Sequence, residues 1–264
     1  MAVRSVHFRV NAEKPRAQAV RGMLAEAAAR VGISEAPPGE ADVIVTLGGD
    51  GTLLRAVHEF PGSPVLGLNL GGLGYLANVG ESEFEAAVAM LAEGRYKVSE
   101  RRLIEADGRF PALNDIVVTR ETGGHAARFE LRADGRLVTE YMADGLIFAT
   151  PTGSTAYSLA AGGPVLMPDS GSFVVTPINP HALGVRPLVV SDEVRFEVTV
   201  RSRTAGNAMT VGVYADGENV AGLEEGRSAV VARSERTARF VELDGYDPYG
   251  VLARKLGWSG SNVK

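Results

Sequence analysis

Residues 41–60 read A-D-V-I-V-T-L-G-G-D-G-T-L-L-R-A-V-H-E-F. Residues 43–47 form a short apolar run rich in β-branched side chains, which predicts a strand buried on both faces of a parallel sheet. The run stops at Gly48, and Thr52 opens an apolar pattern at helical spacing. We therefore expect a strand that enters a helix through a glycine turn.

This turn has the composition of a phosphate-binding loop. Gly48, Gly49 and Gly51 can take backbone conformations closed to other residues and let a ligand approach the main chain. Backbone N–H groups and the positive end of a helix dipole then point at one small space. Asp50 would repel a phosphoryl group there, unless a metal bridges the two or the carboxylate takes a proton from an attacking hydroxyl. That chemistry is typical of a kinase; the alternative is a tight turn in which Thr52 caps the helix, and spacing alone does not separate the two.

Length and composition bound the class of protein. At 264 residues the chain is long enough for two domains, which we favour over one, and 45% hydrophobic with 22% charged residues indicate a globular protein. A net charge of −5 argues against a nucleic-acid partner. Neither a membrane span nor a signal-peptide core is evident, so we expect a cytoplasmic protein. The absence of cysteine excludes disulfides and cysteine-ligated metals, and the four histidines lie far apart, so we expect no protein metal site.

The first part of the chain has the pattern of an α/β domain. Residues 3–10 alternate as a strand does, and residues 11–31 have helical spacing that ends at Gly32. Residues 65–70 predict a second strand that enters a loop with Gly71, Gly72 and Gly74. Loops at the carboxyl ends of neighbouring strands border one crevice, so both glycine loops are expected to face each other, although a bend without a ligand remains an alternative.

A helix and a change of pattern end this part. Residues 82–91 predict a helix with a capping box formed by Ser82 and Glu85, and Gly94 stands where a helix ends. From about Tyr96 onward, short alternating runs separated by turns indicate a mostly antiparallel β domain.

We therefore expect an N-terminal Rossmann-like α/β domain and a C-terminal β domain. The first comprises residues 1–95, joined by a helical tail at about 240–264, and the second comprises residues 96–239. Within the second, strands are expected at residues 193–200, 210–214 and 228–232. Hairpin turns are expected at the Asp-Gly pairs that begin at residues 107, 134 and 216, but not at Asp144-Gly145, which precedes a continuous apolar run.

A hydroxyl-rich segment interrupts the β pattern and is expected to open a helix. Its hydroxyl residues are Thr150, Thr152, Ser154, Thr155 and Ser158. Ser154 or Thr155 is expected to cap the helix, and the surplus hydroxyls suggest hydrogen bonds to a polar ligand, with Ala156 leaving room for something flat. Tyr157 could stack on such a ligand, but spacing favours a place in the core.

Asn114 and Asp115 stand at the entrance of a predicted strand. They form either a turn or a grip on a diol such as ribose, and spacing leaves both interpretations open.

Several motifs together resemble one family. G-G-D-G-T at 48–52 is similar to NAD kinases and to their diacylglycerol and sphingoid lipid kinase relatives. L-N-D-I-V at 113–117, D-G-L-I-F-A-T-P-T-G-S-T-A-Y-S at 144–158, N-L-G-G-L-G-Y-L at 69–76 and the terminal R-K-L-G-W extend the resemblance over essentially the whole chain. T-P-T-G-S-T-A-Y is distinctive of the bacterial NAD kinases.

The resemblance implies transfer of a phosphoryl group from ATP or polyphosphate to the adenosine ribose 2′-hydroxyl of NAD, giving NADP. It also implies a donor-bound divalent cation such as Mg²⁺, and a homodimer or homotetramer. Asp50 matches the catalytic carboxylate, Asn114 and Asp115 match ribose and adenine contacts, and Asp144 matches a contact near the nicotinamide. The further NAD-binding positions implied are Gly51, Tyr75, Thr152, Thr155, Ala156, Tyr157, Ser158, Ala160, Asn179, Asp216 and Glu218. The phosphate-binding candidates are Gly48, Gly49, Gly51, Thr52 and Arg55.

Four positions depart from the family pattern as the resemblance presents it. Asp115 stands where Glu is more frequent, Tyr75 where Phe is common, Ala160 where Ser is frequent and Glu218 where Gln is usual. Two rival functions remain at this point. A lipid kinase would need a large apolar cleft, and the hydroxyl-rich segment argues against one. A noncatalytic NAD(P)-binding sensor would have no use for Asp50.

Overall fold

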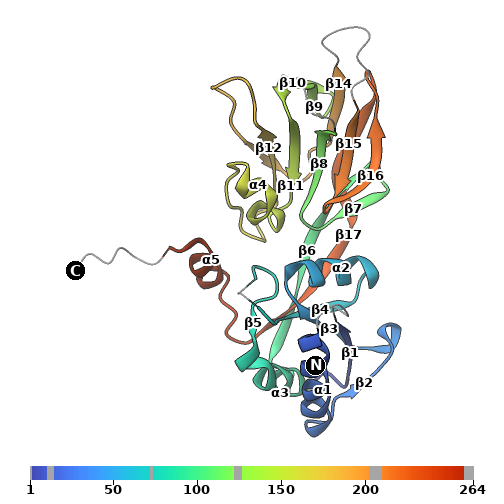
Figure 1. The fold of residues 1–264 in the computed structure, drawn as a ribbon, viewed down its shortest axis with the longest axis vertical. Helices are drawn as coiled ribbons and strands as arrows, with labels where there is room; N and C mark the ends of the chain where they lie inside the picture. The colour runs from blue at the N-terminus through green and yellow to red at the C-terminus, as the bar shows by residue number, and fades with distance from the viewer. Residues whose placement is uncertain (1, 11–14, 72–73, 122–126, 202–209, 259–264) are drawn as a thin grey trace, which may run out of the picture. The chain divides into compact units, whose positions relative to one another are not determined.

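The computed structural model describes residues 2–10, 15–71, 74–121, 127–201 and 210–258. The chain forms two compact units, Met1–Glu100 with Ala238–Lys264, and Arg101–Thr237 (Figure 1). These limits lie within a few residues of the expected domain boundaries. The boundaries themselves stay a prediction, because compactness does not show that either unit folds alone.

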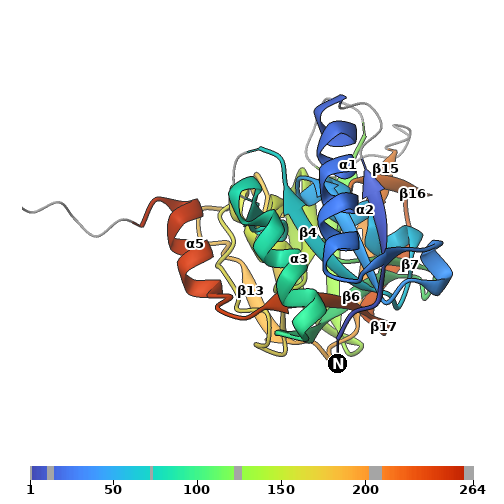
Figure 2. The ribbon, with the colours of Figure 1, turned by 90° about the horizontal axis from the view of Figure 1, so that it is seen from below.

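The first unit is built on a parallel sheet. Its strands, in sheet order, are β17 (Ser228–Leu243), β4 (Pro64–Asn69), β3 (Val43–Gly48), β1 (Ser5–Val10) and β2 (Ser34–Glu35), with β5 (Val79–Gly80) on β4. Its helices are α1 (Pro15–Arg30), α2 (Asp50–Glu59), α3 (Phe84–Glu93) and α5 (Pro248–Leu256), and α1 lies beside α3 (Figure 2). All six residues of β3 are buried, as the apolar run predicts for a strand covered on both faces.

Two helix starts in this unit differ from the prediction. Helix α2 begins at Asp50 rather than at Thr52, with Gly49 as its N-cap and no side-chain cap. The expected capping box at Ser82 and Glu85 is wrong, because α3 begins only at Phe84 and the carboxylate that reaches back is Glu83, 2.9 Å from the amide of Gly80.

The helix ends follow the sequence. Gly94 ends α3 with a φ of 72°, and Gly32 follows α1 with a φ of 83°. The expected first residues of the first helix, 11–14, lie outside the described residues.

The second unit contains antiparallel strands in two sheets. One group is β10 (Arg136–Ala143), β9 (Ala127–Ala133), β14 (Phe196–Arg201) and β17, and β6 (Tyr96–Ala106) pairs with β17 and β7 (Phe110–Ala112). The other sheet is β13 (Leu188–Ser191), β12 (Ser172–Ile178), β11 (Gly145–Ala149), β8 (Asp115–Arg120), β15 (Val211–Ala215) and β16 (Glu218–Leu223). The core between them includes Phe129, Phe148 and Phe196. This is the α/β plus antiparallel β architecture that the sequence predicts.

The turns behave as expected. Asp107, Asp134 and Asp216 take φ values of 52°, 48° and 48°, and the glycine after each also has a positive φ. At residues 134 and 216 the two central residues of a two-residue hairpin are both left-handed, as a type I′ turn requires.

The end of the chain corrects one expectation and confirms another. The strand expected at residues 228–232 extends to Leu243, because β17 pairs first with β14 and then, at Arg239 and Phe240, with β4. The helix therefore starts only at Pro248, where the Asp247 carboxylate accepts a hydrogen bond from the amide of Tyr249 at 3.0 Å. Residues 238–264 belong to the first unit, so the tail returns to it as expected.

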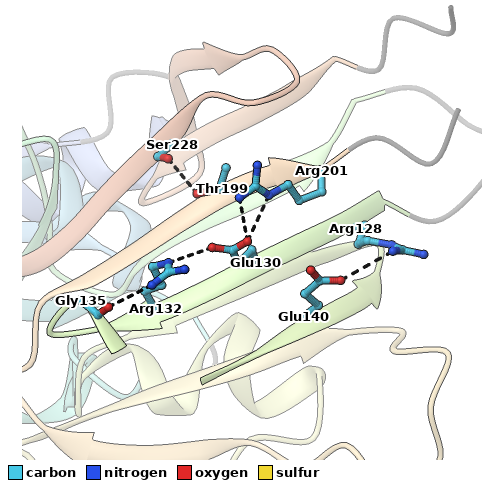
Figure 3. A network of polar contacts seen from close by, with 8 residues as sticks. All are labelled: Arg128, Glu130, Arg132, Gly135, Glu140, Thr199, Arg201 and Ser228. Carbon is cyan, nitrogen blue, oxygen red and sulfur yellow. Dashed lines mark hydrogen bonds and ion pairs between the residues drawn. The ribbon is translucent and has the colours of Figure 1, made fainter. Parts of the chain in front are cut away.

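Charged side chains from strands β10, β9 and β14 pair on one face of the sheet (Figure 3). Glu130 accepts hydrogen bonds from Arg132 Nε and from Arg201, each at 2.8 Å, and Arg128 lies 3.6 Å from Glu140. These side chains alternate with the core residues of the same strands, so one face of the group is apolar and the other is charged.

Candidate active site

The glycine turn between β3 and α2 leaves free space beside the backbone. None of Gly48, Gly49 and Gly51 has a positive φ, so the turn does not use the backbone freedom that these glycines offer. A Cβ at Gly48 would collide with the side chain of Thr52, whereas a Cβ at Gly49 or Gly51 would meet nothing within 4 Å. Gly48 is therefore required by packing, and Gly49 and Gly51 border open space at a helix N-terminus.

The half-buried carboxylate of Asp50 is fixed by three consecutive backbone amides of the second glycine loop. Its Oδ2 accepts a hydrogen bond from Tyr75 N at 2.8 Å, and its Oδ1 accepts from Leu76 N at 3.1 Å and Ala77 N at 2.9 Å. A Cβ at Gly74 would collide with Asp50 Oδ1. Strands β3 and β4 are neighbours in the sheet, so the two loops meet at one edge, as predicted.

Asn69 connects the two ends of this second loop. Its side chain is buried at the end of β4, where Nδ2 donates to Ala77 O at 3.0 Å and Oδ1 accepts from Gly71 N at 2.8 Å. Gly74 N also donates to Ala77 O, at 3.1 Å. Gly72 lies outside the described residues.

Three further predicted positions lie in the first unit. Thr52 is buried, and Arg55 is exposed on α2. The Tyr75 ring has Lys255 Nζ 5.4 Å from its centroid. The pKa of Tyr75 is raised, first by burial and then by the charge of Asp50. Contact of Arg55 with phosphate stays a prediction.

The second unit has a cavity of about 360 Å³ over β8. Its lining residues are Asn114, Asp115, Val117, Thr119, Ala156, Tyr157, Tyr214, Asp216 and Gly217. Alternation along β8 explains this, because Ile116 and Val118 belong to the core while Asp115, Val117 and Thr119 lie on the opposite face. Five predicted NAD-binding residues are thereby brought together: Asn114, Asp115, Ala156, Tyr157 and Asp216.

Two carboxylates in this cavity have opposite environments. Asp216 accepts hydrogen bonds from the amides of Leu113 and Asn114 at 2.7 Å and of Asp115 at 3.3 Å, so it holds the start of β8 in place. Asp115 is 5% exposed, and its carboxylate receives no hydrogen bond from any described residue. Burial first, and the charge of Asp216 second, raise the pKa of Asp115 to about 7.

The hydroxyl-rich segment uses most of its hydroxyls internally. Thr150 donates to Leu113 O at 2.6 Å, Ser154 donates to Pro151 O at 2.6 Å, and Ser158 pairs with Thr176 at 2.8 Å. Thr155 donates to Thr152 O at 3.1 Å. The surplus that suggested a ligand is therefore largely explained by the fold, and NAD contacts of Thr152, Thr155 and Ser158 stay a prediction.

Two expectations about this segment are wrong. Neither Ser154 nor Thr155 caps the helix, because α4 (Tyr157–Ala160) has only four residues and Ala156 is its N-cap. Tyr157 is 47% exposed and lines the cavity instead of packing in the core. The segment lies close to β8, since a Cβ at Gly153 would collide with Asn114 O.

Asp144 and Asn179 lie together, but neither lines the cavity. Asp144 Oδ1 accepts from Arg120 Nε at 2.7 Å, and Oδ2 accepts from Asn179 Nδ2 at 3.0 Å. The Arg120 hydrogen bond, followed by that of Asn179, lowers the pKa of Asp144. Thr152, Ser158, Ala160 and Glu218 are likewise not lining residues, and their predicted contacts remain untested.

Sequence reasoning assigned no role to Asn69, Thr119 and Tyr214. Thr119 and Tyr214 follow from alternation along β8 and β15, once Asp115 and Asp216 are placed on the cavity face. Asn69 carries no local signal, because its partners are reached only through the folded loop.

Both units match domains of a known protein family. The ATP-NAD kinase N-terminal domain matches residues 5–96, and the ATP-NAD kinase C-terminal domain matches residues 113–243. This chain belongs to the NAD kinase family. It is therefore an enzyme, a kinase that phosphorylates NAD to NADP with ATP. The lipid kinase and sensor alternatives are set aside by these matches.

Individual relatives of this chain are NAD kinases as well. The chain is 37% identical over 231 residues to an NAD kinase of Syntrophotalea carbinolica, covering 84% of this chain and 80% of the relative. It is 42% identical over 228 residues to an NAD kinase of Symbiobacterium thermophilum, covering 83% and 79%.

Two solved structures share the fold. Yeast NADH kinase complexed with NADH has a TM-score of 0.86 at 23% identity, over 100% of this chain and 90% of that chain. An NAD kinase from Archaeoglobus fulgidus in complex with ATP has a TM-score of 0.80 at 27% identity, over 97% and 99%. Within the described part of the chain, each helix is too short or too polar to span a bilayer.

Proposed function

We propose that Asp50 is the general base of this NAD kinase and takes the proton of the adenosine ribose 2′-hydroxyl as the phosphoryl group is transferred. The observation that carries the proposal is the distribution of its hydrogen bonds. Oδ1 receives two amides and Oδ2 receives one, so Oδ2 retains room for a hydroxyl. A base must reach its proton at hydrogen-bond distance, and a fixed carboxylate beside open space meets that condition.

We propose that NAD binds in the cavity of the second unit. Asp115 has no donor among the described residues, and a ribose diol supplies two hydroxyl donors. Tyr157 and Tyr214 offer aromatic faces on which a flat base can stack. The remaining predicted NAD contacts, including Asp144 and Asn179, belong to this proposal.

The donor phosphates are assigned to the glycine turn at residues 48–52, with Arg55 as a further cation. Within this turn Gly48 ends β3 and the amide of Thr52 donates to Gly49 O at 2.9 Å, so the amides at the start of α2 are the proposed phosphate donors. The open space at Gly49 and Gly51 and the helix N-terminus support this assignment. The same proposal includes polyphosphate as an alternative donor to ATP. It also includes assembly as a homodimer or homotetramer and a cytoplasmic location.

A divalent cation such as Mg²⁺ is expected to arrive with the donor. No group of three or more His, Cys, Asp or Glu side chains suited to a metal occurs among the described residues. Bound to donor phosphates, such an ion would neutralise their charge.

The test is NADP formation from NAD, ATP and Mg²⁺ by purified enzyme and by Asp50→Asn. We expect kcat to fall by roughly 10²–10⁴-fold, which is what a positioned base supplies. Asp42→Asn is a matched control, because the Asp42 carboxylate also accepts two backbone amides in the same unit, from Arg4 and Ser5. Near-normal turnover of Asp50→Asn would remove Asp50 from the role of base.

A further inference from the structure

We propose that Asn69 is a positioning residue for phosphoryl transfer: its side chain holds the second glycine loop in the shape that fixes the Asp50 carboxylate. The inference rests on the proposed role of Asp50. It adds that a residue outside the first glycine turn orients the Asp50 carboxylate.

The Asp50 side chain depends on other residues for its orientation. A side chain in the first turn of a helix, beside open space, has several staggered rotamers available. What selects one rotamer is the set of amides from Tyr75, Leu76 and Ala77, at 2.8 to 3.1 Å. The orientation of the carboxylate is therefore set by the second loop.

Few contacts of its own hold the described part of this loop, where Gly74 N donates to Ala77 O at 3.1 Å. Residues 74–78 belong to no helix or strand, and Gly71 and Gly74 bring backbone freedom to the segment. Gly74 cannot be replaced by a larger residue without a collision, because a Cβ there would meet both Asp50 Oδ1 and Ala77 O.

Asn69 forms hydrogen bonds with the loop at both of its ends. It is 4% exposed, at the end of a strand buried within the parallel sheet, so its own position is fixed by the sheet. Its amide donates to Ala77 O at 3.0 Å and its carbonyl accepts from Gly71 N at 2.8 Å.

Ala77 links Asn69 to Asp50. Ala77 receives the Asn69 hydrogen bond on its carbonyl and gives its own N–H to Asp50 Oδ1 at 2.9 Å. Displacement of residue 77 therefore moves one of the donors that orient the carboxylate. A shift on the order of 1 Å in a reacting group costs about 10²-fold in rate.

The test is a double-mutant cycle in the full-length enzyme, with NADP measured by a sensitive cycling assay. We expect Asn69→Ala to lower kcat by roughly 10–10²-fold with a much smaller rise in KM for NAD, because the proposed NAD cavity is built by the other unit and only Tyr75 of the proposed NAD contacts lies on the second loop. In the Asp50→Asn background, Asn69→Ala should have no further effect on kcat, since residues that act through one group are not additive. A merely structural role would lower kcat in both backgrounds alike.

Matched variants separate positioning from folding. Asn78→Ala removes an asparagine nearby in the chain whose side chain makes no hydrogen bond with the described residues, and it should keep wild-type kcat. Asn69→Asp keeps the acceptor for Gly71 N but places an oxygen against Ala77 O, so it tests the same link if Asn69→Ala does not fold.

The outcomes are distinct. Loss in Asn69→Ala that vanishes in the Asp50→Asn background supports the inference. Unchanged kcat, or equal loss in both backgrounds, overturns it and leaves the role of Asp50 intact. Near-normal turnover of Asp50→Asn overturns both proposals together.

Discussion

At position 115, folding places a carboxyl group where its charged form is disfavoured. Asp115 is buried beside Asp216, whose own carboxylate is occupied by three backbone amides. Burial and the neighbouring charge raise its pKa from 3.8 to about 7. A site that keeps an unpaired carboxyl group buried is less stable than it could be without ligand, which is common where a ligand will supply the missing donors.

The raised pKa makes ligand-free stability depend on pH. Between about pH 4 and 7 the folded chain keeps a proton on Asp115 that the unfolded chain has lost, so this contribution to stability falls as pH rises. We expect Asp115→Asn to be more stable than wild type at pH 8, by up to about 4 kcal/mol for a shift of this size, and similar at pH 4. Urea unfolding at the two pH values measures the difference.

The control for this prediction is Asp169→Asn. Asp169 is exposed and lies outside the cavity, so its substitution should change stability little at either pH. Equal stability of Asp115→Asn and wild type at pH 8 would show that the buried carboxyl group carries no such penalty.

At the scale of helices and strands, the sequence predicts the elements that depend on residues close together in the chain. The strand at β3, the helix that follows it and the Asp-Gly hairpins at 134 and 216 depend on runs and turns a few residues long, and all are present. For the segment at 150–158 the predicted cap and the predicted core position of Tyr157 are wrong. The partners of Thr150 and Ser158, Leu113 and Thr176, lie far away in the sequence, so local spacing does not reveal them.

The same distinction applies to the candidate site. Residues of the cavity were predicted in part from motifs, whereas the contact between Asp50 and residues 75–77 depends on two strands being neighbours in the sheet. Periodicity shows that both loops end strands, but not which amides a carboxylate will accept. The path of β17 into the parallel sheet was missed for a similar reason, since its pairing partner is β4.

The Glu130 network on β9 and β14 gives a prediction for a pair of strands. Hydrogen bonds from Arg201 first, and then from Arg132, lower the pKa of Glu130 (Figure 3). A lowered folded pKa adds stability above the unfolded value of about 4.3, and this contribution is lost as pH falls through the folded pKa. We therefore expect Glu130→Gln to be less stable than wild type at pH 7 and closer to it at pH 3, by urea midpoints.

Glu197→Gln is the comparison for this variant. Glu197 lies on β14 and makes no ion pair with the described residues, so its substitution should not change the pH dependence. A stability difference between Glu130→Gln and wild type that is the same at both pH values would contradict the role of the network.

At the scale of the whole molecule, the two units carry different parts of the proposed reaction. Asp50 and both glycine loops belong to the first unit, and the proposed NAD cavity belongs entirely to the second. Binding and chemistry should therefore be separable by mutation. A ligand that binds only the folded state stabilises it by about 2.7 kcal/mol at a concentration of 100 Kd.

We expect Asp50→Asn to lose NADP formation yet keep the rise in Tm that NAD causes in wild type. Ala156→Phe should lose both, because a ring at Ala156 would extend into the cavity lined by Asp115 and Tyr157. Thermal unfolding with increasing NAD, each variant against its own ligand-free Tm, makes the comparison independent of any change in basal stability. If Ala156→Phe retained the full NAD-dependent rise in Tm, NAD would have to bind elsewhere. If Asp50→Asn lost that rise, the carboxylate would contribute to binding as well as to proton transfer.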